Sequence, residues 1–201
     1  MAEPITGLDA ERVAANLARV RAEITEAAGR VGRDPDAVEV CVATKYVVPE
    51  EMPVLVEAGV TLAGENRQQD LAAKRAALAT AGVGDGALAF DFIGHLQSRK
   101  VKQVLPHVRL IHSVASDSVL EQLAKHGTPE TEVLVEVNVS NEPGKSGIDP
   151  ASLDAFLERC PVRVRGCPCS RPEARDHSRT VLSVLLVASS RPSGLNATSW
   201  T

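Results

Sequence analysis

The 201-residue chain has few aromatic residues and no large excess of charge of one sign. Aromatic side chains make up only 2% of it, so it lacks the stacking surface with which many proteins bind single-stranded nucleic acid. Its formal net charge is −4, which removes the electrostatic reason to expect nucleic acid or an anionic membrane as a partner. We therefore expect neither nucleic acid nor a membrane among its partners.

Long apolar runs, a leader peptide and a cysteine framework are also missing. No stretch of about 18 apolar residues occurs, so no membrane span is expected, and the first residues contain no apolar segment typical of a secretory signal. The four cysteines are too few and too scattered for a disulfide scaffold, and their spacing matches no zinc site: Cys41, Cys160, Cys167 and Cys169. These absences predict a cytoplasmic protein with reduced thiols and no metal.

Short apolar segments alternate with helical patterns along most of the chain. An amphipathic helix is predicted over residues 8–29. Expected strands cover 38–44, 60–63, 88–93, 109–114, 132–139 and 162–165, and expected helices cover 49–58, 66–81, 98–105, 117–125 and 150–159. Nearly continuous apolar strands are typical of a parallel sheet that is covered on both faces. The fold class is therefore α/β, with six β units that are each followed by a helix except the last.

Both a doubly wound sheet and a closed barrel would explain this alternation. Polar residues recur at or just after the predicted strands: Lys45, Glu65, Asn66, His95, Ser113 and Asn138. In a (β/α)8 barrel such residues converge on one mouth. A doubly wound sheet more often has a glycine-rich phosphate turn after its first strand, and Thr44-Lys45-Tyr46 contains no glycine. The pattern therefore favours a (β/α)8 TIM barrel of which about six units are recognisable.

Each of these polar residues has a structural and a functional interpretation. A lysine at a strand end commonly extends into solvent, but in a barrel mouth of low dielectric its pKa falls and the neutral amine can form a Schiff base. Asn66 is either the N-cap of the following helix or an amide that faces a ligand. His95 is either a structural hydrogen-bonding residue or a group at the barrel mouth beside Lys45. His112, Ser113 and Asn138 must find polar partners, which could be a ligand, a water or a neighbouring residue.

Several stretches resemble, in order, the motifs of the pyridoxal phosphate homeostasis protein family. Phe92-Ile93-Gly94-His95-Leu96-Gln97-Ser98-Arg99-Lys100 is similar to that family's near-diagnostic F-I-G-H-L-Q-x-N-K. The weaker matches are Val42-Ala43-Thr44-Lys45, Gly64-Glu65-Asn66-Arg67-Gln68-Gln69, Ile111-His112-Ser113-Val114, and Val137-Asn138-Val139-Ser140 with Lys145-Ser146-Gly147. The resemblance covers about residues 8–166.

The resemblance implies a barrel of the alanine racemase N-terminal type, with pyridoxal 5′-phosphate (PLP) bound to Lys45 as an aldimine. It also implies that Asn66, His95, Ser113 and Asn138 line the cofactor site. The expected function is storage or delivery of PLP, with PLP-dependent apoenzymes as partners and without catalysis. A racemase would need a second acid/base group on the opposite face of the cofactor, which alanine racemases take from a further domain for which this chain has no room.

The likeness stops at Gly166. The family's S-M-G-M-S and V-R-x-G segments do not follow, although the loops after strands seven and eight form the phosphate site in phosphate-binding barrels. We therefore expect residues 1–166 to be the PLP-binding portion of a barrel. Residues 167–201 are expected to be an atypical tail rich in Ser and Arg, disordered or produced by a shift of reading frame. The alternatives are a non-functional truncated fragment without ligand and, less favoured, a PLP-dependent amino-acid racemase.

Overall fold

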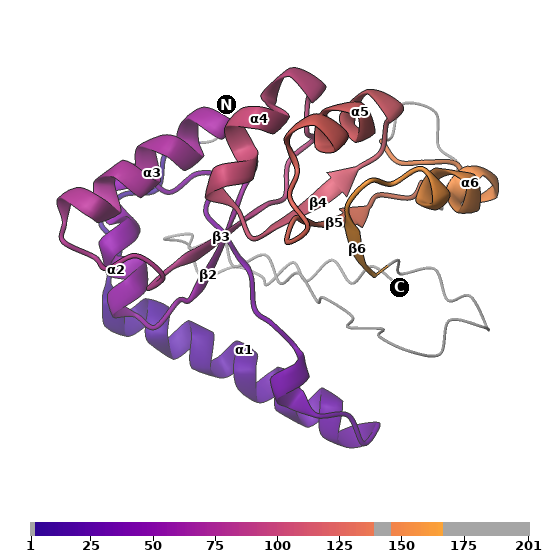
Figure 1. Cartoon of the computed structure of the whole chain (residues 1–201). Helices are drawn as coiled ribbons and strands as arrows, with labels where there is room; N and C mark the ends of the chain where they lie inside the picture. The colour runs from indigo at the N-terminus through magenta and orange to yellow at the C-terminus, as the bar shows by residue number, and fades with distance from the viewer. Residues whose placement is uncertain (1–2, 139–145, 167–201) are drawn as a thin grey trace. The chain divides into compact units, whose positions relative to one another are not determined.

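The computed structural model describes residues 3–138 and 146–166. These residues form two compact units, which Figure 1 shows as parts of one ribbon coloured along the chain. The first unit contains residues 3–65 and 69–89, and the second contains residues 66–68, 90–138 and 146–166. The predicted tail at 167–201 lies outside the described residues, so its expected character stays a prediction.

The elements of the first unit follow the predicted order. Its helices and strands are α1 (Ala10–Arg30), β1 (Val42–Ala43), α2 (Met52–Glu57), β2 (Leu62–Glu65) and α3 (Gln68–Thr80), whose first residue belongs to the second unit. Short 3-10 helices cover Pro35–Ala37 and Pro49–Glu51. The second of these replaces the start of the helix predicted over 49–58.

The second unit continues the alternation. Its elements are β3 (Ala89–Phe92, begun in the first unit), α4 (Val101–Val104), β4 (Leu110–Val114), α5 (Asp117–His126), β5 (Glu132–Val135), α6 (Leu153–Glu158) and β6 (Arg163–Gly166). Single 3-10 turns flank α4 and precede α6, at Ser98–Lys100, Leu105–His107 and Pro150–Ser152. The predicted helix over 98–105 is thus one helical turn between two tighter ones.

Within the described residues, six strands form one sheet in the order β1-β2-β3-β4-β5-β6. The pairs β1–β2, β3–β4, β4–β5 and β5–β6 are parallel. Sequential order is the order of the strands in a βα-barrel wall, whereas a doubly wound sheet reverses its order next to the first strands. The prediction of an α/β fold with six parallel strands is confirmed, and the strand order is that of a barrel.

Two carboxylates determine where the first helix begins. The side chain of Asp9 accepts a hydrogen bond from the Arg12 amide at 2.8 Å, which satisfies one of the free N–H groups at the start of α1. Glu51 accepts hydrogen bonds from the amides of Gly7 and Leu8 at 2.5 and 3.1 Å. The segment before α1 is therefore attached to the turn that leads into α2.

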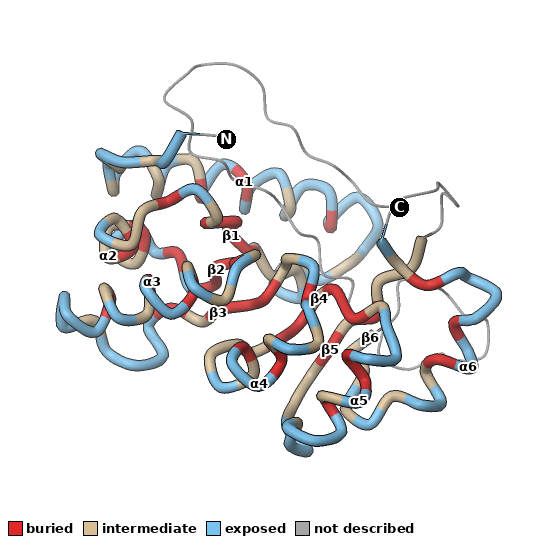
Figure 2. Tube along the Cα trace, turned by 90° about the horizontal axis from the view of Figure 1, so that it is seen from above, coloured by how far each residue is buried: buried red, intermediate tan, exposed pale blue. Residues whose placement is uncertain are grey.

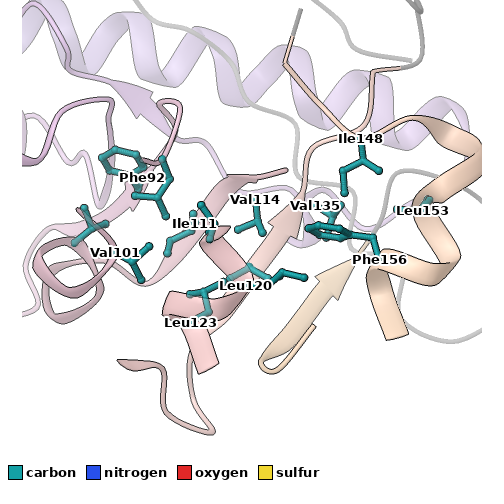
Figure 3. Packing of buried hydrophobic residues seen from close by; sticks show 14 residues of the cluster. Phe92, Val101, Ile111, Val114, Leu120, Leu123, Val135, Ile148, Leu153 and Phe156 are labelled. Carbon is teal, nitrogen blue, oxygen red and sulfur yellow. The ribbon is translucent and has the colours of Figure 1, made fainter. Parts of the chain in front are cut away.

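The hydrophobic core of the second unit lies between its strands and the helices α4, α5 and α6. Figure 3 shows Phe92, Ile111 and Val135 from the strands packed among side chains of these helices. The buried strand segments appear red in Figure 2, while the helices are pale blue on their outer sides. Burial of this apolar surface is the main stabilising contribution of the unit. Because this core fixes the strands, it also fixes the polar residues that follow their carboxyl ends.

Two strands are shorter than their apolar runs. Residues 38–41 lie outside β1: in the register Val42↔Ala63 they would lie opposite residues 59–62, of which only Leu62 belongs to β2. In β5 the register shifts between Val133 and Leu134, and Val137 instead forms an isolated bridge with Ile148. Residues 38–40 and 136–138 are only half-buried, so in both runs neither burial nor pairing extends over the whole predicted strand.

Candidate functional site at the strand ends

Lys45 follows β1 and occupies the first central position of a tight turn. The turn is closed by a hydrogen bond of 2.8 Å from the Val47 amide to the Thr44 carbonyl. Lys45 is half-buried, and its Nζ lies 4.9 Å from the centre of the Tyr46 ring. In the part of the chain that the structure describes, no carboxylate is paired with this amine. A lysine reacts as a nucleophile through its neutral amine, and no ion pair with a described carboxylate has to be broken before this amine can meet a ligand.

The segment before α1 supports the same turn from outside. Ile5 and Val47 form an isolated parallel bridge. The Ile5 amide donates to the Tyr46 carbonyl at 2.7 Å, and the Val48 amide donates to the Ile5 carbonyl at 3.2 Å. Two residues that follow Lys45, Tyr46 and Val48, are thus hydrogen-bonded to a segment about forty residues earlier in the chain.

A buried polar cluster lies directly behind the turn and consists of Thr44, Glu65 and Lys74. All three are at most 1% exposed. The Nζ of Lys74 donates to the Thr44 carbonyl at 2.6 Å and to Oε1 of Glu65, which also accepts from the Thr44 hydroxyl. The other carboxylate oxygen, Oε2 of Glu65, is buried and has no hydrogen-bond partner among the described residues. We call this group the Thr44–Glu65–Lys74 cluster.

The second unit brings Asn66, Gly94 and Ser113 together. A Cβ on Gly94 would lie 2.6 Å from Cα and 2.7 Å from Cβ of Asn66, so only glycine fits there. The hydroxyl of Ser113 donates to the carbonyl of Gly94. Three of the segments that carry the family resemblance therefore meet at one point. Oδ1 of Asn66 is buried and lacks a partner among these residues, which leaves an amide group available to a ligand.

His95 and Asn138 are placed differently. His95 directly follows Gly94, but its side chain is exposed. Asn138 is half-buried, and its amide donates to the Ile148 carbonyl at 2.9 Å. Gly147 lies against it, because a Cβ at that glycine would be 2.5 Å from the Asn138 nitrogen. The structure therefore groups Asn66 with Ser113 through Gly94. His95 is exposed instead, and Asn138 lies against Ile148 and Gly147.

A second polar network in this unit centres on Asp91, which is fully buried within β3. Arg109 donates to both of its oxygens, at 3.1 and 2.9 Å, and Nε2 of His112 lies 2.9 Å from Oδ2. Burial by itself raises the pKa of Asp91, but hydrogen bonds from His112 and Arg109 outweigh it and hold the pKa below its ordinary value of 3.8. Asp91 is thus an ionised carboxylate that joins β3 to β4.

Sequence reasoning missed three of these buried charges: Asp91, Glu65 and Lys74. The signal for Lys74 was its position, since Leu71, Lys74 and Leu78 recur at helical spacing on the buried face of α3. Asp91 interrupts an apolar strand just as His112 interrupts the next, and two such residues in neighbouring strands can pair. Glu65 was expected after a strand end, but only as part of the turn before Asn66 and not as a buried charge. Ser113 has a neighbouring residue as its partner, because its hydroxyl donates to the Gly94 carbonyl.

Two groups in the described part of the chain, one in each compact unit, are chemically suited to PLP. Lys45 offers an amine with no ion-pair partner in the described part of the chain, and Asn66 offers a buried amide with an unpartnered oxygen. The groups needed by the phosphate belong, in barrels of this kind, to loops that would follow β6.

Among described residues no helix is long and apolar enough to cross a membrane, and no group of three or more His, Cys, Asp or Glu could bind a metal.

The fold defines an α/β protein whose parallel strands run in sequential order, with polar residues after their carboxyl ends. Among curated proteins, the pyridoxal phosphate homeostasis proteins of Escherichia coli K12 and Pseudomonas aeruginosa are similar. The first is 33% identical over 161 residues, which cover 77% of this chain and 68% of that protein. The second is 36% identical over 149 residues, which cover 73% and 63%. The chain belongs to the pyridoxal phosphate homeostasis protein family, although no protein-family model matches it.

Solved structures agree with this assignment. A protein of unknown function from Bifidobacterium adolescentis is 33% identical, with a TM-score of 0.69 over 83% of this chain and 72% of that one. PipY of Synechococcus elongatus PCC7942, solved with PLP bound, is 26% identical, with a TM-score of 0.60 over 77% and 68%. This chain spans less than two thirds of the length of the Pseudomonas relative.

Proposed function

We propose that this chain binds PLP through the amine of Lys45 and serves intracellular PLP homeostasis rather than catalysis. The observation that carries the proposal is the position of Lys45, at the carboxyl end of β1 and without a carboxylate partner among the described residues. The family membership and the PLP bound to PipY support it. When bound, PLP supplies an aldehyde carbon that accepts a lysine nitrogen with loss of water, and a phosphate that requires hydrogen-bond donors.

The roles of the other residues follow from their surroundings. Asn66 offers its side-chain amide, whose oxygen is buried, to the ligand. Gly94 allows the backbone after β3 to approach Asn66 closely. Ser113 acts through Gly94, because its hydroxyl is donated to that carbonyl. His95 and Asn138 complete the proposed site, since each follows the end of a strand in a parallel sheet. Lys45 itself holds the ligand covalently.

Two further parts of the proposal concern setting and partners. PLP-dependent apoenzymes are the proposed recipients, because a reversible bond to an amine allows the cofactor to be passed to another lysine. The proposed site of action is the cytoplasm, which agrees with Cys41 and Cys160 forming no disulfide in the described part of the chain.

Absorbance tests the binding proposal directly. The purified chain is titrated with PLP, and a visible absorption band is expected that disappears in Lys45→Ala. Lys125→Ala is the matched control, because Lys125 is an exposed lysine on α5, far in sequence from the site. A band that persists in Lys45→Ala, or no band in the unaltered chain, contradicts the proposal. Measurable racemisation of an amino acid by the same preparation would favour the enzymatic alternative.

A comparison of PLP with pyridoxal tests the phosphate contribution. The family's S-M-G-M-S and V-R-x-G segments are missing after Gly166, so we expect the two aldehydes to bind with dissociation constants within about tenfold of each other. A preference for PLP of several hundredfold would mean that other residues of this chain bind the phosphate. Inorganic phosphate as competitor provides the control, since it would then weaken PLP binding.

A further inference from the structure

The Thr44–Lys45 peptide is held from its buried side by a charged side chain. The Thr44 carbonyl accepts the Lys74 ammonium at 2.6 Å and the Val47 amide at 2.8 Å, so both of its lone pairs are used. The first of these bonds is charge-assisted and lies in a fully buried position, where such bonds are strongest. The plane of the peptide that leads into Lys45 is therefore fixed by a residue of α3.

Glu65 keeps this ammonium in place. Its Oε1 accepts both Lys74 Nζ and the hydroxyl of Thr44, so the carboxylate at the end of β2 joins the helix to the end of β1. The side chains of Lys74 and Glu65 are 2% and 0% exposed. Solvent does not compete for this pair, which makes it a rigid connection rather than a surface ion pair.

A buried ion pair is a poor way to stabilise a fold. Removing two charges from water costs several kcal/mol, and apolar side chains of similar volume often stabilise a protein as well or better. Leu71 and Leu78 show that the buried face of α3 is otherwise apolar. The pair is therefore better explained by the geometry it imposes on its neighbour than by the stability that it adds.

We propose that Lys74 and Glu65 are positioning residues for Lys45: they hold the turn of residues 44–47 so that the Lys45 amine faces one direction. The inference rests on the proposed function, because it explains how that lysine is presented to an aldehyde. Neither residue contacts the ligand in this proposal. They act through the Thr44 carbonyl.

The test replaces the whole pair at once. A single substitution such as Lys74→Met would leave an unpaired buried carboxylate and could prevent folding. The double variant Lys74→Met/Glu65→Leu removes both charges with little change in volume. Leu78→Ala is the matched control, since it creates a cavity in the same helix without touching the turn. Thermal melting compares the stability of the two variants.

Three readouts distinguish positioning from stability. The first is the rate at which PLP attaches to Lys45, which we expect to fall about tenfold in the double variant and less than twofold in Leu78→Ala. The second is peptide mass spectrometry after borohydride reduction, which should find the label shifted from Lys45 toward other lysines only in the double variant. The third is hydrogen exchange of the Val47 amide, which we expect to quicken in the double variant without ligand.

The results separate this inference from the proposed function. If the unaltered chain gives no Lys45-dependent band, the proposed function fails. If it gives the band and the double variant attaches PLP at the same rate, with the same selectivity and unchanged Val47 exchange, the positioning role is overturned. If the double variant does not fold, amine acetylation of the unaltered chain decides the matter. Lys74 should then resist labelling while Lys45 reacts, and equal labelling of both overturns the inference.

Discussion

Gly94 lies against the backbone of Asn66, and this contact joins the ends of two strands. A Cβ at position 94 would come within 2.6 Å of the Asn66 Cα and still closer to its carbonyl oxygen. Real Cβ atoms do not approach backbone so closely, so the glycine is required by space rather than by backbone conformation. The presence of glycine at position 94, within the stretch Phe92–Lys100 that resembles the family motif, thus has a steric explanation.

Gly94→Ala is expected to destabilise the chain by about 1–3 kcal/mol, because the added methyl group must displace the backbone of Asn66. The same displacement should weaken PLP binding. Urea unfolding and PLP titration measure the two effects. Gly29→Ala is the control, since Gly29 lies within α1 with open space around it and should gain up to about 1 kcal/mol in helix propensity. Equal stability of the two variants would contradict the steric account.

Asp91→Asn is expected to cost about 3 kcal/mol at neutral pH, because it breaks a buried network with Arg109 and His112. The pKa of Asp91 is lowered in the folded chain, so its contribution is fully present above the unfolded value of about 4 and is lost as the pH falls below it. Urea unfolding between pH 7 and pH 3 should therefore show a shallower loss of stability in the variant. The exposed Asp85→Asn should follow the unaltered chain. Parallel curves for Asp91→Asn and the unaltered chain would refute this role.

Cys160 should react slowly with alkylating reagents. Burial raises the pKa of its thiol above 9.0, and a backbone hydrogen bond with Val162 only partly opposes this. Less thiolate is therefore present at pH 8 than in an unfolded peptide. Mass spectrometry of iodoacetamide-treated protein measures the rate, with the chain in urea as reference. Faster alkylation in the folded chain than in urea would show the prediction to be wrong.

Glu51→Ala should lower the free energy of unfolding by about 1 kcal/mol, because the amides of Gly7 and Leu8 lose their acceptor. The neighbouring Glu50→Ala removes an equal charge from an exposed position and should change stability little. Thermal melting of both variants provides the comparison. If both lose the same amount, net charge rather than these two hydrogen bonds determines the effect.

The alternation of strands and helices was predictable because each buried strand is a short apolar run bounded by glycine or polar residues. The strand boundaries were less predictable. β1 has two paired residues where seven were expected, because pairing depends on where β2 begins. At the site, Lys45 and Asn66 could be named from their positions after strands. The Thr44–Glu65–Lys74 cluster could not, because it joins residues thirty positions apart, and only the lysine on the apolar face of α3 pointed to it.

The hydrogen bonds of Ile5 to the turn around Lys45 have a practical consequence for anyone who prepares this protein. An affinity tag or fusion partner placed directly ahead of that segment would lie a few residues before Ile5, whose backbone is hydrogen-bonded to the turn that contains Lys45. It could pull the bridge to Val47 apart and change the measured reactivity without any substitution at the site. Recombinant material for cofactor measurements is therefore best compared before and after removal of an N-terminal tag.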